Sequence, residues 1–233
     1  MPEEVFDVAS LAKYLHLSPQ QVQKLVKRDE IPSRLVGGKP RFSRAEVHQW
    51  MESRMGLLDD SELAAVESQM LSEDADQPVT IANLLSVETT AIPLAARTRN
   101  SVIDGMTDIG VCAGLLWDKE KMAEAIKARE ELQSTAMDNG VALLHPRRPQ
   151  PNILAEGFVA LGLTGQGIPF GGSRHLTDVF WLVCSVDERS HLQTLARISR
   201  LLVNVAFLDD LRNCSSPAEA HTCVEGYESK LNA

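Results

Sequence analysis

The chain has 233 residues, of which 44% are hydrophobic and 24% charged, a composition typical of a folded protein of one or two domains. Its 23 basic and 32 acidic residues give a formal net charge of −9, which taken as a whole argues against nucleic-acid binding. No segment has the roughly 18 uninterrupted apolar residues of a membrane helix, and the acidic start MPEEVFDVAS differs from a signal peptide. The four cysteines include no C-x-x-C pair, so we expect buried reduced thiols rather than disulfides or a metal site, and hence a cytoplasmic location. We also expect no cofactor, no metal and no membrane insertion.

The negative charge is unevenly distributed along the chain. Residues 1–55 contain nine basic and seven acidic residues, whereas residues 56–78 contain seven acidic residues and no basic one. Residues 79–233 are mildly acidic, with 14 basic and 18 acidic side chains. We therefore expect two domains, 1–55 and 79–233, joined by a solvated acidic linker over residues 56–78. The linker would repel DNA or shield a basic face of the first domain.

The first domain begins with two short helices. Asp7 predicts the N-cap of a helix over 8–15, and Ser18 followed by Gln21 predicts a capping box on a second helix that has Pro19 at its first position. Two short helices joined by a tight turn are typical of a helix-turn-helix. The second helix buries one apolar face and presents glutamine and basic side chains on the other.

A hairpin and a third helix follow the first two. Two short extended runs, 31–36 and 40–42, meet at Gly37-Gly38, which predicts a β-hairpin. Ser43 with Glu46 three residues later predicts a second capping box at the start of the third helix.

Side chains suited to DNA contact occur on the second helix and the hairpin. Amide groups can pair with base edges in the major groove, and basic groups neutralise phosphates. The candidates are Gln20, Gln21, Lys24, Lys27 and Arg28 on the helix, and Arg34, Lys39 and Arg41 on the hairpin.

The run from Phe6 to Met51 resembles the excisionase/MerR-like winged helix-turn-helix domain. The resemblance implies that the second helix and the wing contact DNA. A small helical protein-interaction module with solvated charges is the alternative. Because a net charge of +2 provides few phosphate contacts, we expect weak, salt-dependent binding by one copy and a homodimer on paired half-sites.

The second domain is expected to be α/β, with a mixed central sheet flanked by helices. Thr80, Asp118, and Asp187 or Ser190 are the expected helix N-caps. The expected helices are 81–85, 100–106, 119–132 and a last one from 188–191 to about 205, and the expected strands are 91–94, 141–144, 157–163 and 178–184.

Three cationic or titratable residues of this domain occupy unusual positions. Arg129 continues the apolar stripe of the helix over 119–132, either as an edge residue whose charged end reaches solvent or as a buried anion ligand. His145 ends a buried strand in front of a stiff loop carrying Arg147 and Arg148. His191 lies in the first turn of a helix, where backbone N–H groups favour an anion. The remaining histidines are interpreted as structural, and no third ligand supports a metal site; these histidines are His16, His48, His175 and His221.

The segment AREELQSTAMDNGVALLHP resembles the phosphorylation-site segment of the enzyme IIA domain of the mannitol/fructose class of the phosphotransferase system, whose nitrogen-related members share the pattern. GIPFGG, LTDVFWLV and ERSHLQTLARISRLL resemble further family segments, so that the likeness spans residues 79–228. The residues that match the family pattern around the site are Arg129, Glu130, Ser134, Thr135, Gly140, Val141, Ala142 and His145.

By this resemblance His145 is the phospho-acceptor, His191 hydrogen-bonds the phosphoryl group and Arg129 is its cationic partner. Ser134, Thr135, Arg147 and Arg148 are the expected phosphate-loop residues. Leu144 and Pro146 depart from the family, which has a proline before the histidine and a small residue after it. Pro146 removes one backbone N–H that could bind phosphate.

Together the two resemblances imply a DNA-binding transcriptional regulator. A phosphocarrier of the HPr type would phosphorylate His145, and the added charge of about −1.5 to −2 would tune DNA binding. This would be phosphohistidine transfer rather than metabolic turnover. The alternatives are a phosphocarrier that passes phosphate to a sugar permease, and an interaction module that is never phosphorylated.

Overall fold

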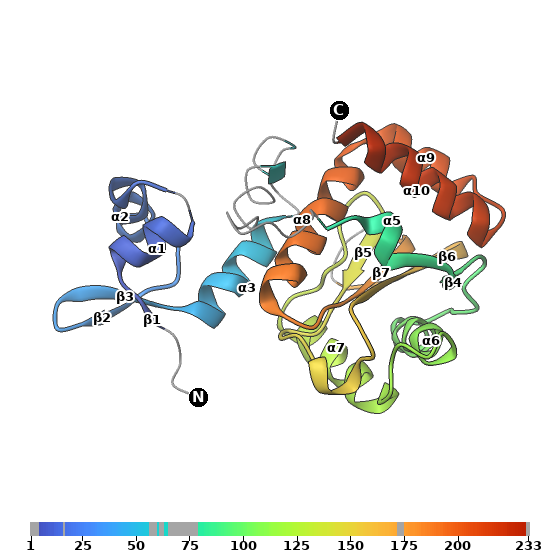
Figure 1. The fold of residues 1–233 in the computed structure, drawn as a ribbon, viewed down its shortest axis with the longest axis horizontal. Coiled ribbons are helices and arrows are strands. Elements are labelled where there is room, and N and C mark those ends of the chain that lie inside the picture. The colour runs from blue at the N-terminus through green and yellow to red at the C-terminus, as the bar shows by residue number, and fades with distance from the viewer. Residues whose placement is uncertain are drawn as a thin grey trace. The chain divides into compact units, whose positions relative to one another are not determined.

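The computed structural model describes residues 5–15, 17–55, 60, 63–64, 79–171 and 175–231. The chain divides into two compact units, Met1–Asp76 and Gln77–Ala233 (Figure 1). Most of the expected acidic linker, and His16, lie outside the described residues. Within the described ranges, no helix combines the length and apolarity needed to cross a membrane.

The N-terminal unit combines helices with a small antiparallel sheet of order β1-β3-β2. Asp7 caps its first helix, and Ser18 and Gln21 exchange hydrogen bonds across the first turn of the second, which confirms both expected caps. The elements are β1 (Val5–Phe6), α1 (Val8–Tyr14), α2 (Pro19–Lys27), β2 (Arg34–Val36), β3 (Lys39–Ser43) and α3 (Arg44–Met55).

The predicted hairpin is confirmed as the pair β2 and β3. Val36 pairs with Lys39 across the turn, and the two glycines between them have φ values of +60° and +75°. A two-residue turn with positive φ at both positions matches the twist of antiparallel strands, which is why this step takes glycine twice.

The second expected capping box, between Ser43 and Glu46, is not formed. Ser43 is the last residue of β3 and pairs with Val5, and its buried hydroxyl finds no hydrogen-bond partner among the described residues. The Glu46 carboxylate instead accepts a 2.6 Å hydrogen bond from Arg34. The Glu46 carboxylate is therefore paired with a cation from the neighbouring strand rather than with the Ser43 backbone N–H.

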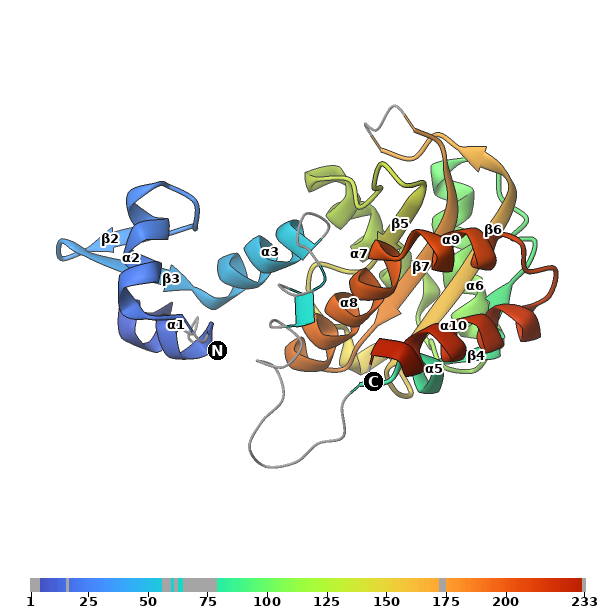
Figure 2. The same ribbon diagram turned by 90° about the horizontal axis from the view of Figure 1, so that it is seen from above.

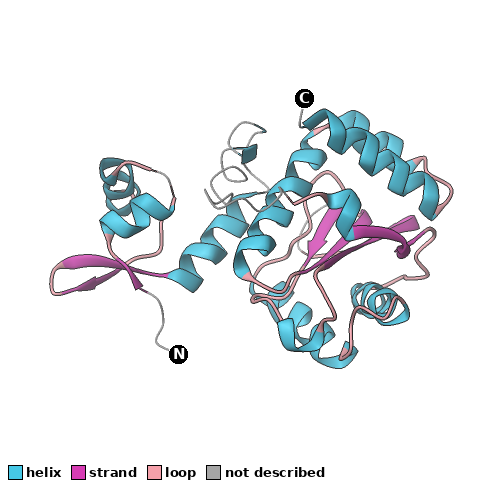
Figure 3. Ribbon diagram, in the orientation of Figure 1, coloured by secondary structure: helices cyan, strands magenta, loops and turns pink. Residues whose placement is uncertain are grey.

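The C-terminal unit has a four-stranded sheet of order β4-β6-β7-β5, in which only the central pair is antiparallel. Helices cover both faces of this sheet, so the mixed α/β architecture is confirmed (Figures 1, 2 and 3). The elements are α5 (Ile81–Leu84), β4 (Leu85–Ala91), α6 (Arg99–Cys112), α7 (Lys119–Leu132), β5 (Val141–Leu144), η1 (Pro151–Ile153), β6 (Phe158–Ile168), β7 (Thr177–Cys184), α8 (Glu188–Val203), α9 (Val205–Arg212) and α10 (Pro217–Leu231).

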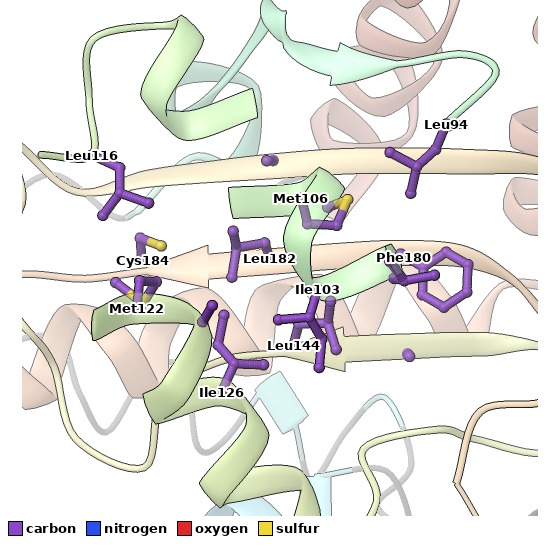
Figure 4. Close-up of a cluster of buried hydrophobic side chains, with 14 of the residues drawn as sticks. Leu94, Ile103, Met106, Leu116, Met122, Ile126, Leu144, Phe180, Leu182 and Cys184 are labelled. Carbon is purple, nitrogen blue, oxygen red and sulfur yellow. The ribbon is translucent and has the colours of Figure 1, made fainter. Parts of the chain in front are cut away.

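A hydrophobic core lies between the sheet and helices α6 and α7 (Figure 4). Alternate residues of β7, namely Phe180, Leu182 and Cys184, belong to it, as a strand with a period of two requires. Ile103 of α6 and Ile126 of α7 pack against them. This packing fixes the sheet beneath the residues that carry chemistry.

Several expected boundaries in this unit were wrong. Thr80 makes no side-chain cap; the Glu228 carboxylate accepts hydrogen bonds from the Ile81 and Ala82 N–H groups at 2.7 and 2.9 Å. The strand expected over 91–94 is instead β4, which ends at Ala91. The helix expected over 100–106 is α6, which begins at Arg99 after the N-cap Thr98 and continues to Cys112.

The cysteines differ from the expectation of buried thiols. Cys184 is buried, whereas Cys112 is exposed and Cys214 and Cys223 are half-buried. The apolar or small neighbours of these cysteines in the sequence do not distinguish a core strand from a helix end.

Candidate functional site

The two parallel strands β5 and β7 bring the candidate histidines together. His145 directly follows β5, and β7 is followed by the short turn that leads to α8 and His191. Since parallel strands end at the same edge of a sheet, the two residues meet there. Their ring centroids are 5.3 Å apart with an interplanar angle of 59°.

The ring of His145 is fixed by its own strand. Nδ1 lies 2.8 Å from the Leu143 carbonyl oxygen. Because a carbonyl oxygen can only accept, Nδ1 carries the proton, and a neutral ring then has its lone pair on Nε2. The arrangement defines which nitrogen can act as a nucleophile. Both rings are buried, with His145 4% and His191 2% exposed.

The start of α8 is held by Asp187, which positions His191 four residues later. The Asp187 carboxylate accepts hydrogen bonds from the N–H groups of Arg189 and Ser190, both at 2.9 Å. Burial alone would raise the pKa of Asp187, but hydrogen bonds from Ser190 and Arg189 hold that pKa below its usual range. Asp187 is thus a charged cap under ordinary conditions, and His191 belongs to a well-anchored first turn.

Arg129 lies on the buried face of α7 near its C-terminus, rather than at an edge with its charge in solvent. Its Nη1 donates a 2.7 Å hydrogen bond to the Gln133 carbonyl oxygen. This bond closes the end of α7, so the guanidinium is oriented by the backbone that leads toward β5.

The Glu130 carboxylate accepts hydrogen bonds from two of the residues expected in a phosphate loop, Ser134 and Thr135. Thr135 donates to it through both its N–H and its hydroxyl, and the Ser134 hydroxyl donates at 3.2 Å. Arg99 of α6 forms an ion pair with Glu130 at 3.7 Å and lies over the Phe170 ring at 5.7 Å. The hydroxyls of Ser134 and Thr135 are therefore engaged with an anion of the protein itself.

The sequence predicts only part of this network. Glu130 matches the family pattern but has no role there, and Arg99 stands 31 positions earlier in the chain. The one local indication is that Glu130 follows Arg129 and so borders the buried face of α7.

The segment after α7 also protects the edge of β5. Ala136 bridges to Ala142, and the Met137 N–H donates to the Val141 carbonyl oxygen at 2.8 Å. An edge strand without such cover offers unpaired backbone groups. The strand that carries His145 is consequently held on both sides, by β7 and by this segment.

The loop after His145 begins with a buried proline and then turns outward. Pro146 is buried, whereas Arg147 and Arg148 are exposed. Two exposed guanidinium groups so close to His145 in sequence supply positive charge at the sheet edge.

The expected DNA-contact residues lie on the surface of the N-terminal unit. All are exposed except Arg41, which is half-buried. Gln21 has its amide oxygen engaged by the Ser18 N–H, leaving its amide N–H groups to face outward. Arg34 stands directly opposite Arg41 in the hairpin and is paired with Glu46.

Two of the histidines interpreted as structural have clear structural contacts. His48 is buried and its Nε2 lies 2.5 Å from the Tyr14 hydroxyl. His221 Nε2 lies 3.0 Å from the Ala82 carbonyl oxygen. His175, in contrast, is exposed.

Comparison with known families identifies both units. Residues 83–226 match the family model described as phosphoenolpyruvate-dependent sugar phosphotransferase system, EIIA 2, and residues 5–55 match a helix-turn-helix domain. The chain belongs to the EIIA type 2 family. It combines an N-terminal helix-turn-helix DNA-binding domain with this EIIA domain.

Individual relatives agree with the EIIA assignment. The fructose-specific EIIABC component of the phosphotransferase system of Bacillus subtilis is 29% identical over 149 residues, which are 62% of this chain and 22% of that protein. This chain thus matches about a fifth of that relative's length.

Solved structures share the fold of the EIIA domain. Nitrogen regulatory protein IIA-Ntr from Neisseria meningitidis aligns with a TM-score of 0.55 at 16% identity, over 62% of this chain and 98% of that one. IIA mannitol from Escherichia coli aligns with a TM-score of 0.54 at 17% identity, over 60% and 98%.

Proposed function

We propose that this protein is a cytoplasmic, homodimeric transcriptional regulator whose EIIA domain is phosphorylated on His145 by an HPr-type phosphocarrier. Phosphorylation would change the affinity of the excisionase/MerR-like helix-turn-helix domain for DNA. The observation that carries the proposal is the pair of buried rings, His145 and His191, with His145 oriented by the Leu143 carbonyl oxygen.

The transfer is a displacement at phosphorus. The Nε2 lone pair of His145 attacks the phosphoryl group of a phosphohistidine on the carrier; the new N–P bond forms as the carrier's N–P bond breaks, and the carrier's imidazole leaves. His191 and the N–H groups at the start of α8 would hydrogen-bond the oxygens. Arg129, Arg147 and Arg148 supply positive charge, and Ser134 and Thr135 would complete the phosphate loop if Glu130 released them.

Phosphorylation changes the charge at the end of β5. The phosphoryl group adds about two negative charges at the sheet edge, which favours a different arrangement from that of the unmodified protein. Such a difference is what a regulator needs to couple a sensor to DNA.

The test is labelling of the full chain by the phosphorylated carrier. Wild type and the matched control His175→Ala, which removes an exposed histidine, should acquire an acid-labile label, whereas His145→Ala should not. His191→Ala should slow labelling by about 10²-fold, as loss of a group that binds the transferring phosphate does. Persistence of the label in His145→Ala would refute the acceptor.

The regulatory step is tested by DNA affinity before and after labelling. We expect the phosphorylated wild type to differ from the unmodified protein, and His145→Ala to stay at the unmodified value under the same treatment. Equal DNA affinity in all these states would leave a phosphocarrier or an interaction module as the better description.

A further inference from the structure

The surface of the α9–α10 hairpin has a shallow, open cavity of about 480 Å³ that the proposed function does not use. Both half-buried cysteines, Cys214 and Cys223, line it together with Asp210, Tyr227 and Lys230. An open cavity beside two thiols admits a small reagent, which distinguishes this pair from Cys184, buried in the core.

The two thiols are adjacent in space although they come from different segments. Cys214 lies two residues beyond α9, and its Sγ donates to the Asp210 carbonyl oxygen at 3.4 Å. Cys223 lies within α10, lines the same cavity as Cys214, and each thiol shifts the pKa of the other. The two thiols are therefore candidates for a disulfide across the α9–α10 turn.

Neighbouring contacts hold the two segments in this arrangement. The Tyr227 hydroxyl donates a 2.5 Å hydrogen bond to the Asp210 carboxylate, which ties α10 to α9. Phe207 and Tyr227 meet edge to face with ring centroids 5.3 Å apart, and the Lys230 ammonium lies 4.3 Å from the Tyr227 ring centroid. The proximity of the thiols therefore does not depend on a single flexible side chain.

We infer that Cys214 and Cys223 are a redox modification site that closes to an intramolecular disulfide with a hydroperoxide as oxidant and reopens with a small thiol such as glutathione. The bond would close a loop of about ten residues between α9 and α10. In a reducing cytoplasm such a bond is transient, as expected of a sensing pair rather than a structural disulfide.

The chemistry balances over two displacements. The Cys214 thiolate attacks one peroxide oxygen, the O–O bond breaks and a sulfenic acid forms with release of water or an alcohol. The Cys223 sulfur then attacks Cys214 Sγ, the S–O bond breaks and water leaves with the thiol proton. Two thiols are oxidised, and one peroxide is reduced.

The surroundings make Cys214 the first nucleophile and keep the reaction slow at neutral pH. Burial raises the pKa of both thiols, that of Cys223 to about 11, and the acidic neighbour Asp210 adds to both shifts. The hydrogen bond from Cys223 stabilises the Cys214 thiolate and partly offsets its shift. The other charged or titratable groups lining the cavity are Glu219, Tyr227 and Lys230.

The experiment treats the full chain with hydrogen peroxide and follows intact mass and the linked peptide. Wild type and the matched control Cys112→Ser, which lacks an exposed cysteine outside the pair, should lose two hydrogens and yield a Cys214–Cys223 cross-linked peptide. Glutathione should reverse both changes. The rate should rise about tenfold per pH unit between pH 7 and 8, because the thiolate is the reactive form.

The single variants Cys214→Ser and Cys223→Ser separate the site from general oxidation. Neither variant should lose two hydrogens; each should gain only oxygen from the peroxide, or a glutathione adduct once glutathione is added, with circular dichroism like that of wild type. Wild type that gains oxygen without a cross-linked peptide would overturn the inference, as would a peptide that joins Cys112 or Cys184 instead. These readouts do not involve His145, so they stand apart from the test of phosphorylation.

Discussion

At Gly171 the backbone comes so close to Ser134 that a Cβ atom would lie 1.9 Å from the Ser134 hydroxyl oxygen. The residue also has a φ of +74°, which disfavours any other side chain. Ser134 is one of the donors to Glu130, so this contact connects the loop before β7 with the network beside the candidate site.

Gly171→Ala should therefore destabilise the protein through both strain and collision. We expect a loss of about 2–5 kcal/mol in unfolding free energy, the sum of left-handed strain and overpacking. Gly114→Ala is the matched control, because Gly114 also has φ +74° but a Cβ there meets nothing within 4 Å. It should lose only about 1–2 kcal/mol in urea unfolding; equal losses in both variants would show that the Ser134 contact is unimportant.

Of the individual contacts, the histidine pair could be predicted from the sequence and the Arg99–Glu130 ion pair could not. His145 and His191 were predicted as partners because a family resemblance named them, and the parallel strands then bring their rings together. The Arg99–Glu130 ion pair was not predicted, because the buried face of a helix reveals neither the partner nor its element. Charges that meet across the fold leave no periodic pattern in the chain.

Among the elements, helix α8 is stabilised at its first turn by the charged cap Asp187. Because the pKa of Asp187 is depressed in the folded state, its contribution to stability is present above the ordinary carboxyl pKa of about 4 and is lost as pH falls through the depressed value. We expect the Ser190 amide proton resonance to titrate with that pKa. In Asp187→Asn, which can accept the same hydrogen bonds without ionising, the resonance should stay constant with pH; a titration that persists there would assign it to another group.

The contact between α10, α8 and α5 centres on one carboxylate. Glu228 pairs with Arg197 at 2.8 Å, and both side chains are only 3% exposed. It also caps α5 through two backbone N–H groups. One side chain thus joins three helices.

Glu228→Gln should cost about 3–5 kcal/mol of unfolding free energy, since it leaves the Arg197 charge buried without its counter-ion. Adding Arg197→Met to that variant should recover part of the loss, because it removes the uncompensated charge. Denaturant unfolding of both variants measures the difference. A double variant less stable than Glu228→Gln alone would contradict this account.

Element prediction succeeded where the determinants are local. Asp118 caps α7 as predicted, and both α7 and β5 have the predicted bounds, 119–132 and 141–144. These bounds depend on a cap, a turn and an apolar run that each lie within a few residues of sequence. The cap predicted at Thr80 is absent because Glu228, distant in sequence, accepts the hydrogen bond from the Ile81 N–H. The capping box predicted at Ser43 is absent because Arg34 pairs with the Glu46 carboxylate. The single helix expected to end near Val205 is broken at Asn204, which caps α9.

On the scale of the whole molecule, charge is the property that differs most between the units. The seven carboxylates between residues 56 and 78 adjoin a DNA-binding domain with a surplus of only two basic residues. Converting all seven to amides should raise DNA affinity at low salt, and the gain should shrink as salt is added. The same amide change at the exposed Glu124 and Glu131 of α7 is the control and should have less effect per charge. Unchanged affinity at matched low salt would exclude repulsion by the linker.

The strand order β4-β6-β7-β5 also has a consequence for the path of folding. The central strands β6 and β7 are consecutive in the chain and pair antiparallel, whereas β4 and β5 join the outside in parallel. The residues of β5 are closer in sequence to their partners in β7 than the residues of β4 are to theirs in β6. Because loop closure over short separations comes first, we expect the β6–β7 hairpin to form first, β5 to join next and β4 to dock last. His145 follows β5 and His191 follows β7, so the two rings can meet before β4 has completed the sheet.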